Sequence, residues 1–157
     1  MESPGFTISP ESPLTKDLAL LFERHTADMH FDTPPESIHM MDRGALAVPH
    51  IAFYVLREAA VPLAMGAFKK LNADHAEIKS MHVLMEHRGR GLSKLMLDHL
   101  IAEARAAGIK RLSLETGAQP SFIAARKLYE RAGFSECPPF EGYWDDPNSV
   151  FMTKEIA

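Results

Sequence analysis

The order of segments along the chain predicts an α/β (α+β) fold. It has a central mixed, mostly antiparallel and twisted sheet of six to seven strands, flanked by about four helices. Three strand-like segments joined by short turns between 51 and 84 indicate an antiparallel meander. The amphipathic segment 89–107 then joins the last of them to another strand, as in crossovers between parallel strands. At 157 residues, we expect a single domain, 1–157, with a sizeable core.

The first third of the chain predicts one short strand and two helices. Residues 6–8, bounded by prolines, favour a strand. Apolar residues recur at helical spacing from Leu14 to Phe22, which predicts a helix over 14–30. A second, short helix is predicted within 36–46.

The meander follows. Residues 51–57 are rich in β-branched and aromatic side chains, which predicts a strand. A turn over 58–60 leads to its hairpin partner, 62–70. A third long strand is predicted over 73–84.

The segment 89–107 is the strongest helix prediction. Leu97, Leu100, Ile101 and Ala104 would line one face of it. Gly108 follows as a residue that commonly ends a helix. The next strand is predicted over 111–115.

The C-terminal part predicts one more helix and two closing strands. The helix spans 121–132, with Ser121 as its N-cap and Gly133 as its terminator. The strands are predicted over 134–137 and 150–154.

Composition excludes several classes of protein. The net charge is −4, whereas nucleic-acid-binding chains usually carry a basic excess, so we expect no nucleic-acid partner. The single cysteine, Cys137, allows no internal disulfide, which fits a reducing compartment. There is no basic-then-apolar leader and no apolar run of ~18 residues, so we expect no membrane contact and a cytoplasmic location.

Eight histidines raise the question of a metal. His25 and His30 are five residues apart, as are His82 and His87. Neither spacing gives the i, i+4 pair that places two ligands on one helical face. We therefore expect scattered histidines and no metal site.

The junction between the third meander strand and the strong helix carries the clearest functional signal. It is the turn Arg88-Gly89-Arg90-Gly91. Backbone N–H groups at a helix N-terminus, together with Arg88, Arg90 and Lys94, suit a pyrophosphate. The alternative is a turn in which the glycines serve only the backbone geometry.

Residues 77–134 resemble the acyl-CoA-binding core of the GNAT N-acetyltransferase family, in particular small bacterial-type members of unassigned substrate. The family pattern at the turn is Gln or Arg, two residues, Gly, one residue, then Gly or Ala. Arg88 and Gly91 match this pattern. Ser93 stands where Gly or Ala is usual, and its small side chain still permits close approach.

The resemblance implies a GNAT fold and acetyl-CoA as cosubstrate, with no metal. In the family the pantetheine arm lies beside the strand before the turn and bonds to its backbone like an added strand. The family also often has Asn where Phe122 stands here, which weakens one expected contact. The predicted cofactor-binding residues are Met81, His82, Val83, Arg88, Gly89, Arg90, Gly91, Leu92, Ser93, Lys94, Ser121, Phe122 and Ala125.

Tyr129 is the predicted catalytic acid. It lies in Leu-Tyr-Glu-Arg-Ala-Gly-Phe (128–134), which resembles the family's L-Y-x-x-x-G-F segment. A phenol has a pKa of ~10, close to that of a thiol, so proton transfer to a thiolate is feasible. The alternative is a tyrosine that only packs the helix.

Glu77 is the predicted catalytic base, because it matches a position where several family members carry a catalytic glutamate. Lys79 lies two residues on, on the same face of the strand, so an ion pair is the structural alternative. Glu115, His82 or a water chain are the other candidates for the base.

The resemblance implies an N-acetyltransferase that moves an acetyl group to a primary amine of a small molecule or peptide by direct attack in a ternary complex. The acceptor is expected between Pro35–His39 and Phe140–Ser149, whose carboxylates and aromatic rings suit a cationic amine. A non-catalytic acyl-CoA-binding or sensing module is the alternative; it would not need Tyr129. A homodimer is compatible with the sequence. A dinucleotide-binding oxidoreductase is not, since G-x-G-x-x-G is absent after a first strand.

Overall fold

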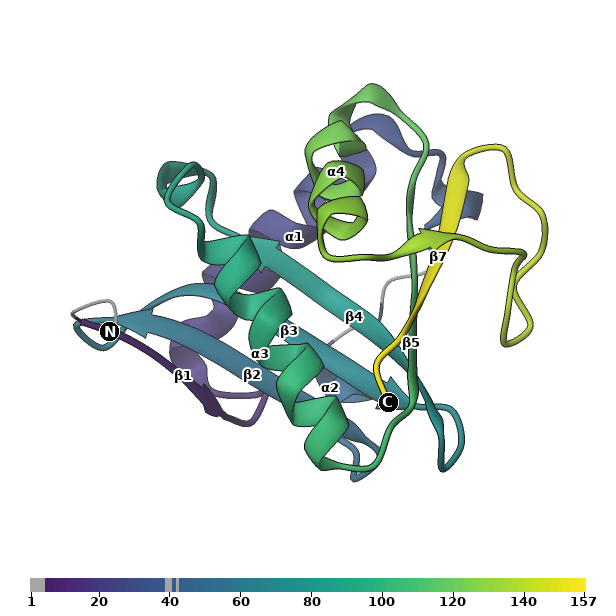
Figure 1. Ribbon diagram of the computed structural model, residues 1–157. Helices are drawn as coiled ribbons and strands as arrows, with labels where there is room; N and C mark the ends of the chain where they lie inside the picture. The colour runs from purple at the N-terminus through teal and green to yellow at the C-terminus, as the bar shows by residue number, and fades with distance from the viewer. Residues whose placement is uncertain (1–4, 39–40, 42) are drawn as a thin grey trace.

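A seven-stranded sheet with helices on both faces forms the body of the molecule (Figure 1). The structure, a computed structural model, describes residues 5–38, 41 and 43–157. The strands lie in the order β1-β2-β3-β4-β5-β7-β6. Their bounds are β1 (Phe6–Pro10), β2 (Ile51–Glu58), β3 (Val61–Lys70), β4 (His75–Val83), β5 (Arg111–Gly117), β6 (Ser135–Glu136) and β7 (Ser149–Glu155).

Within this sheet β4 and β5 run parallel and the other neighbouring strands run antiparallel. The meander β2-β3-β4 turns first at Ala59 and Ala60, which both have positive φ. Helix α3 then connects β4 to β5. The predicted mixed, mostly antiparallel sheet and its crossover are confirmed.

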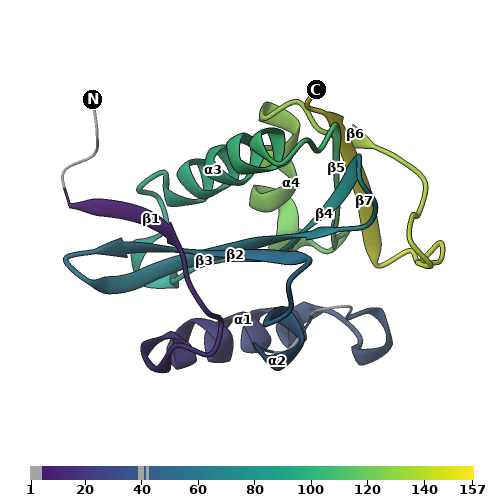
Figure 2. The same ribbon diagram turned by 90° about the horizontal axis from the view of Figure 1, so that it is seen from below.

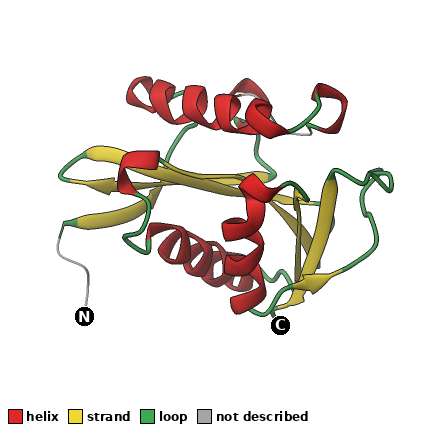
Figure 3. Ribbon diagram, turned by 90° about the horizontal axis from the view of Figure 1, so that it is seen from above, coloured by secondary structure: helices red, strands yellow, loops and turns green. Residues whose placement is uncertain are grey.

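Helices cover both faces of the sheet. Among the described residues the α-helices are α1 (Ala19–Asp32), α2 (Arg43–Leu46), α3 (Leu92–Ala106) and α4 (Ile123–Arg131). Figures 2 and 3 show α1 and α2 against one face and α3 and α4 against the other. Short 3-10 turns, Lys16–Leu18, Pro35–Ser37, Met85–His87 and Pro120–Phe122, precede or separate them.

Helix α3 packs closely on β3 because a glycine lies beneath it. A Cβ at Gly66 would lie 2.9 Å from Met96 Cγ of α3, so a larger residue there would push the helix away. The predicted apolar face of the helix is buried: Leu97, Leu100, Ile101 and Ala104. On the opposite face, Leu18, Leu21 and Phe22 form a second buried cluster with residues of β2 and β3.

Both predicted glycine terminators end their helices. Gly108 has φ +85°, its N–H donates to the Arg105 carbonyl, and the Ile109 N–H donates to the Ala104 carbonyl. Gly133 follows α4 in the same way, with φ +97°. This pair of bonds satisfies carbonyls that the helix end would otherwise leave without a partner.

The early helices differ from the prediction. The helix expected from residue 14 begins with the turn Lys16–Leu18, because Ser12 forms a local turn with Leu14 and Thr15. Leu14 is consequently exposed. The helix expected within 36–46 is split into Pro35–Ser37 and Arg43–Leu46, and Ile38 between them is extended.

The predicted N-cap role of Ser121 is wrong. Helix α4 begins at Ile123, its N-cap is Phe122, and Ser121 lies within the preceding 3-10 turn. The Ser121 hydroxyl instead donates to Asp32 Oδ2 at the end of α1, at 3.1 Å. Ser121 therefore joins the N-terminus of α4 to α1 across the molecule.

Candidate active site

The parallel strands β4 and β5 separate and form a wedge. They pair from His75–Arg111 to Glu77–Ser113 and no further. Beyond that point β5 stays paired with β7 on its other side, while β4 stays paired with β3 (Figure 1). From Ile78 onward, the backbone edge of β4 that faces the wedge is therefore not paired with β5.

A bulge in β4 sets which side chains flank this edge. Ser80 has φ +56°, and the β3–β4 register shifts opposite it, between Met65 and Ala67. Past the bulge, Val83 belongs to the core under α3 and Met81 packs against it. His82 points to the other face, toward α1. The three residues predicted to flank the pantetheine arm thus lie on the unpaired edge.

The Gly/Arg turn closes the wide end of the wedge at the N-terminus of α3. Gly89 and Gly91 have φ +85° and +80°, and Gly91 is the helix N-cap. No side chain among the described residues caps the helix, and a Cβ at either glycine would meet open space. The first N–H groups of a helix have no partner within it, so the turn offers donors to an anion. Leu92 is buried and anchors the turn.

The basic side chains of the turn are held by carboxylates elsewhere in the fold. Arg88 pairs with Asp28 of α1 at 2.7 Å and also donates to the Val83 carbonyl. Arg90 pairs with Glu58 at 2.8 Å and lies over the Phe6 ring. Lys94 pairs with Asp98 one turn along α3 and is 74 % exposed. The two arginines therefore fix the turn against α1 and β2, and the backbone provides the outward-facing donors.

Helix α4 borders the wedge on the side of β5. Its Tyr129 is buried among core residues and contacts the Phe134 ring edge-on. Burial raises the pKa of Tyr129 to about 12, so the phenol is protonated at neutral pH. Ala125 packs against the same core. Phe122 presses its ring against Gly117 at the end of β5, where no side chain would fit.

Glu77 lies at the narrow end of the wedge, at the last paired position. It is 2 % exposed. Its Oε2 accepts a hydrogen bond from the Tyr143 hydroxyl at 2.6 Å and lies 3.3 Å from Lys79 Nζ. The Glu77–Lys79 ion pair, which is the structural alternative to a catalytic role for Glu77, is thus present and buried, and the Tyr143 hydroxyl bonds to the same carboxylate.

The two segments predicted for the acceptor meet beside this cluster. Asn148 Nδ2 lies 3.4 Å from Ser37 Oγ, and Gln119 donates to Asn148 Oδ1 at 3.2 Å. Glu115 accepts a bond from the Ser149 hydroxyl at 2.7 Å. His39, which the prediction included, lies outside the described residues.

His82 occupies a different environment from the glutamates. Its ring contacts His25 of α1 edge-on, with centroids 5.3 Å apart. Burial lowers the pKa of both histidines to about 4, and His25 lowers that of His82 further. His82 is therefore neutral at pH 7 and packs α1 onto β4. It is a weaker base than an ordinary histidine.

Comparison with known proteins identifies the fold. The sequence model of the acetyltransferase (GNAT) family matches residues 18–134. The chain belongs to this family.

Full-length relatives agree with this assignment. The "Uncharacterized N-acetyltransferase YsnE" of Bacillus subtilis is 45 % identical over 141 residues, covering 90 % of this chain and 93 % of that one. The "IAA acetyltransferase" of Azospirillum brasilense is 36 % identical over 157 residues, covering 98 % and 99 %. This GNAT protein is an acyltransferase.

Solved structures share the architecture. An acyl-CoA N-acyltransferase candidate from Klebsiella pneumoniae superposes with a TM-score of 0.78 at 26 % identity, covering 97 % of this chain and 98 % of that one. A GNAT acetyltransferase from Elizabethkingia anophelis, solved with acetyl-CoA bound, has a TM-score of 0.66 at 18 % identity, covering 98 % and 99 %. At that identity the second comparison speaks for the fold alone.

Two further observations concern metal-binding groups and membrane-spanning helices. Among the residues that the structure describes, no group of three or more His, Cys, Asp or Glu side chains could hold a metal ion. The helices found in that part of the chain are too short or too polar to cross a bilayer.

Sequence reasoning did not single out Tyr143, Asp28 or Ser149. Tyr143 lies 66 residues from Glu77 in the chain, and Asp28 lies 60 residues from Arg88. The spacing of residues along the sequence does not indicate contacts between residues so far apart in the chain. The one available signal for Tyr143 was its place in the acidic and aromatic segment 140–149.

Proposed function

We propose that this GNAT protein transfers an acetyl group from acetyl-CoA to a primary amine of a small molecule or peptide, by direct attack in a ternary complex. We further propose that 1–157 acts as a single acetyltransferase domain. The observation that carries the proposal is the wedge itself. It has free backbone donors at its wide end and a buried glutamate at its narrow end.

The residues along the wedge fit the cosubstrate. The N–H groups from Gly89 to Lys94 would hold the pyrophosphate at the positive end of the α3 dipole. Lys94, mostly exposed, would add a positive charge there. The unpaired edge at Met81–Val83 would take the pantetheine arm as an added strand. Ala125 of α4, together with Ser121 and Phe122 of the turn before it, would border the arm.

The acetyl thioester would then lie between β4 and β5, with the base on β4 and the acid on α4, which borders the wedge beside β5. Glu77 accepts a proton from the acceptor ammonium, which leaves a neutral amine as the nucleophile. The amine nitrogen bonds to the thioester carbonyl carbon, and the carbon–sulfur bond breaks as the resulting adduct collapses. Tyr129 donates its proton to the departing thiolate, and the nitrogen of the adduct gives up its extra proton to the tyrosine in return as the amide forms. The raised pKa of Tyr129 keeps its proton available at neutral pH.

The charges around the acceptor side favour a cation. Glu77, Glu115 and Glu141 all lie near Tyr143. Burial contributes most to raising the pKa of the Tyr143 phenol, and the three carboxylates raise it further. Lys79 carries one positive charge beside these three carboxylates, 3.3 Å from Glu77 Oε2. The remaining negative charge would attract an ammonium group over a carboxylate.

The test is release of free CoA from acetyl-CoA in the presence of a panel of primary amines, amino acids and peptides. We expect turnover with at least one cationic amine and acetylation of its nitrogen by mass spectrometry. CoA binding without turnover on any member would contradict the proposal and favour a non-catalytic acyl-CoA-binding module.

A further inference from the structure

Tyr143 bridges the two charged groups at the narrow end of the wedge. Its hydroxyl donates to Glu77 Oε2 at 2.6 Å and accepts from Lys79 Nζ at 2.7 Å. Both Tyr143 and Lys79 approach the same carboxylate oxygen, since Lys79 Nζ lies 3.3 Å from Oε2. Oε1 of Glu77 accepts no hydrogen bond from any residue in the described ranges.

Aromatic packing fixes the phenol in this place. The Tyr143 ring contacts Phe140 edge-on at 5.4 Å and Phe151 of β7 at 5.6 Å between centroids. The Lys79 ammonium lies 5.5 Å from the Tyr143 ring centroid. A tyrosine held by its ring on two sides presents its hydroxyl with little loss of side-chain freedom, which suits a positioning role.

The electrostatics keep the bridge in one protonation state. Burial and the Glu77 carboxylate raise the pKa of the Tyr143 phenol far above its ordinary value, with Glu115 and Glu141 acting in the same direction. The phenol therefore keeps its proton and donates a hydrogen bond to Glu77 over the whole pH range of an ordinary enzyme assay. A hydrogen bond to a charged acceptor is among the stronger ones in proteins.

We propose that Tyr143 is the positioning residue of Glu77: it holds Oε2, together with Lys79, so that Oε1 faces the acceptor ammonium. This inference rests on the proposed function. It also links the segment 140–149, where the acceptor is expected, to the base on β4. An acceptor that displaces this segment would move the carboxylate that must take its proton.

The test is Tyr143→Phe, which keeps the ring and its packing and removes only the hydroxyl. We expect kcat to fall about tenfold to hundredfold, as for loss of one hydrogen bond to a charged group. KM for acetyl-CoA should stay within about twofold, because the hydroxyl is remote from the Gly/Arg turn. In a Glu77→Gln background the same change should alter kcat by less than about threefold, since the two residues act as one unit.

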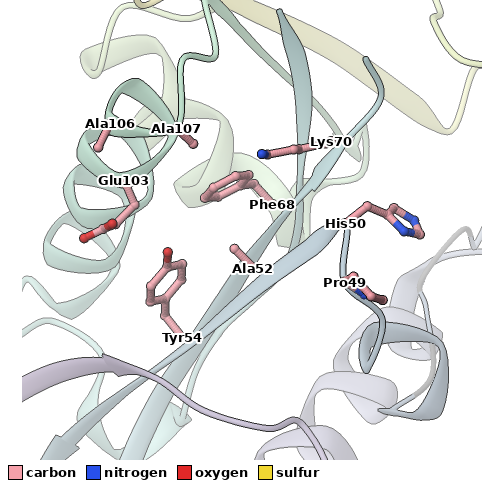
Figure 4. A pocket seen from close by; sticks show the side chains of 9 residues that line it. All are labelled: Pro49, His50, Ala52, Tyr54, Phe68, Lys70, Glu103, Ala106 and Ala107. Carbon is pink, nitrogen blue, oxygen red and sulfur yellow. The ribbon is translucent and has the colours of Figure 1, made fainter. Parts of the chain in front are cut away.

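Tyr54→Phe is the matched control. Tyr54 is also buried, and burial together with a nearby glutamate, Glu103, raises its pKa. Tyr54 lines a pocket of about 340 Å³ between α3 and the strands β2 and β3, together with Ala52, Phe68 and Lys70, and its hydroxyl points toward α3 (Figure 4). This pocket is away from the wedge, so Tyr54→Phe should leave kcat unchanged.

The outcomes separate the positioning role from the function. Equal kcat in Tyr143→Phe, Tyr54→Phe and the parent would overturn the positioning role and leave the proposed function intact. Additive losses in Tyr143→Phe and Glu77→Gln would also overturn it. No turnover by the parent on any amine, with CoA still bound, would overturn the proposed function and the role of Tyr143 with it.

Discussion

Replacement of His25 by Gln should flatten the pH dependence of folding stability below neutrality. His25 and His82 are only 8 % and 7 % exposed, and their rings are in contact. Burial lowers the pKa of each from 6.5 to about 4. Both are therefore neutral in the folded protein at pH 5 to 6, where an exposed histidine of the unfolded chain would already bind a proton.

The sign and size follow from this difference. As pH falls from 6.5 toward 4, the unfolded state gains protons that the folded state does not, so the free energy of unfolding falls. Each histidine contributes a slope of up to ~1.4 kcal/mol per pH unit. Over the whole window that is about 3 kcal/mol per histidine, a large share of a typical domain stability of roughly 5–15 kcal/mol. The contribution is complete above pH 6.5.

The assay is urea unfolding followed by far-UV circular dichroism, at half-unit steps between about pH 4.5 and 7.5, a range that spans the difference between the folded and unfolded pKa values. The slope of the unfolding free energy against pH should be smaller in His25→Gln than in the parent, by about the contribution of one histidine. His30→Gln is the control, since His30 is exposed on the same helix. An unchanged slope in His25→Gln would refute the conclusion that burial lowers the pKa of His25 in the folded protein.

Three substitutions test the proposed site. Gly91→Asp should abolish CoA binding by calorimetry, because a carboxylate would repel the pyrophosphate, whereas Gly108→Asp, with the same positive φ at the other end of α3, should bind normally; equal binding by both would place the cradle elsewhere. Glu77→Gln should lower turnover at least roughly tenfold, most at low pH, and an unchanged pH–rate profile would move the role to Glu115, His82 or a water chain. Tyr129→Phe should lower kcat at least roughly tenfold with little change in KM for acetyl-CoA or in Tm; full activity would make the tyrosine structural.

Much of the fold was predictable because its signals are local. The apolar face of α3, from Leu97 to Ala104, and the glycines after α3 and α4 specify two helices with their ends. The meander follows from β-branched runs with short turns between them. The N-cap prediction for Ser121 was wrong because its hydroxyl donates to a distant partner, Asp32, in place of a local cap. The bulge at Ser80 has no sequence signature of its own.

The candidate site was predictable only in part. The Gly/Arg turn is a contiguous motif, so its place at the end of β4 could be anticipated. The partners that hold its arginines, Asp28 and Glu58, come from α1 and β2, and their choice depends on tertiary packing. The environment of Glu77 likewise depends on Tyr143, which reaches β4 from a loop far along the chain.

Backbone hydrogen exchange with and without acetyl-CoA tests the central claim most directly, namely that the cosubstrate occupies the wedge. We expect slower exchange over 78–83 and 89–94, where the unpaired edge of β4 and the turn would donate to the ligand, and no change in β2. Unchanged exchange in both segments at saturating acetyl-CoA, or protection confined to the pocket beside Tyr54, would contradict the account.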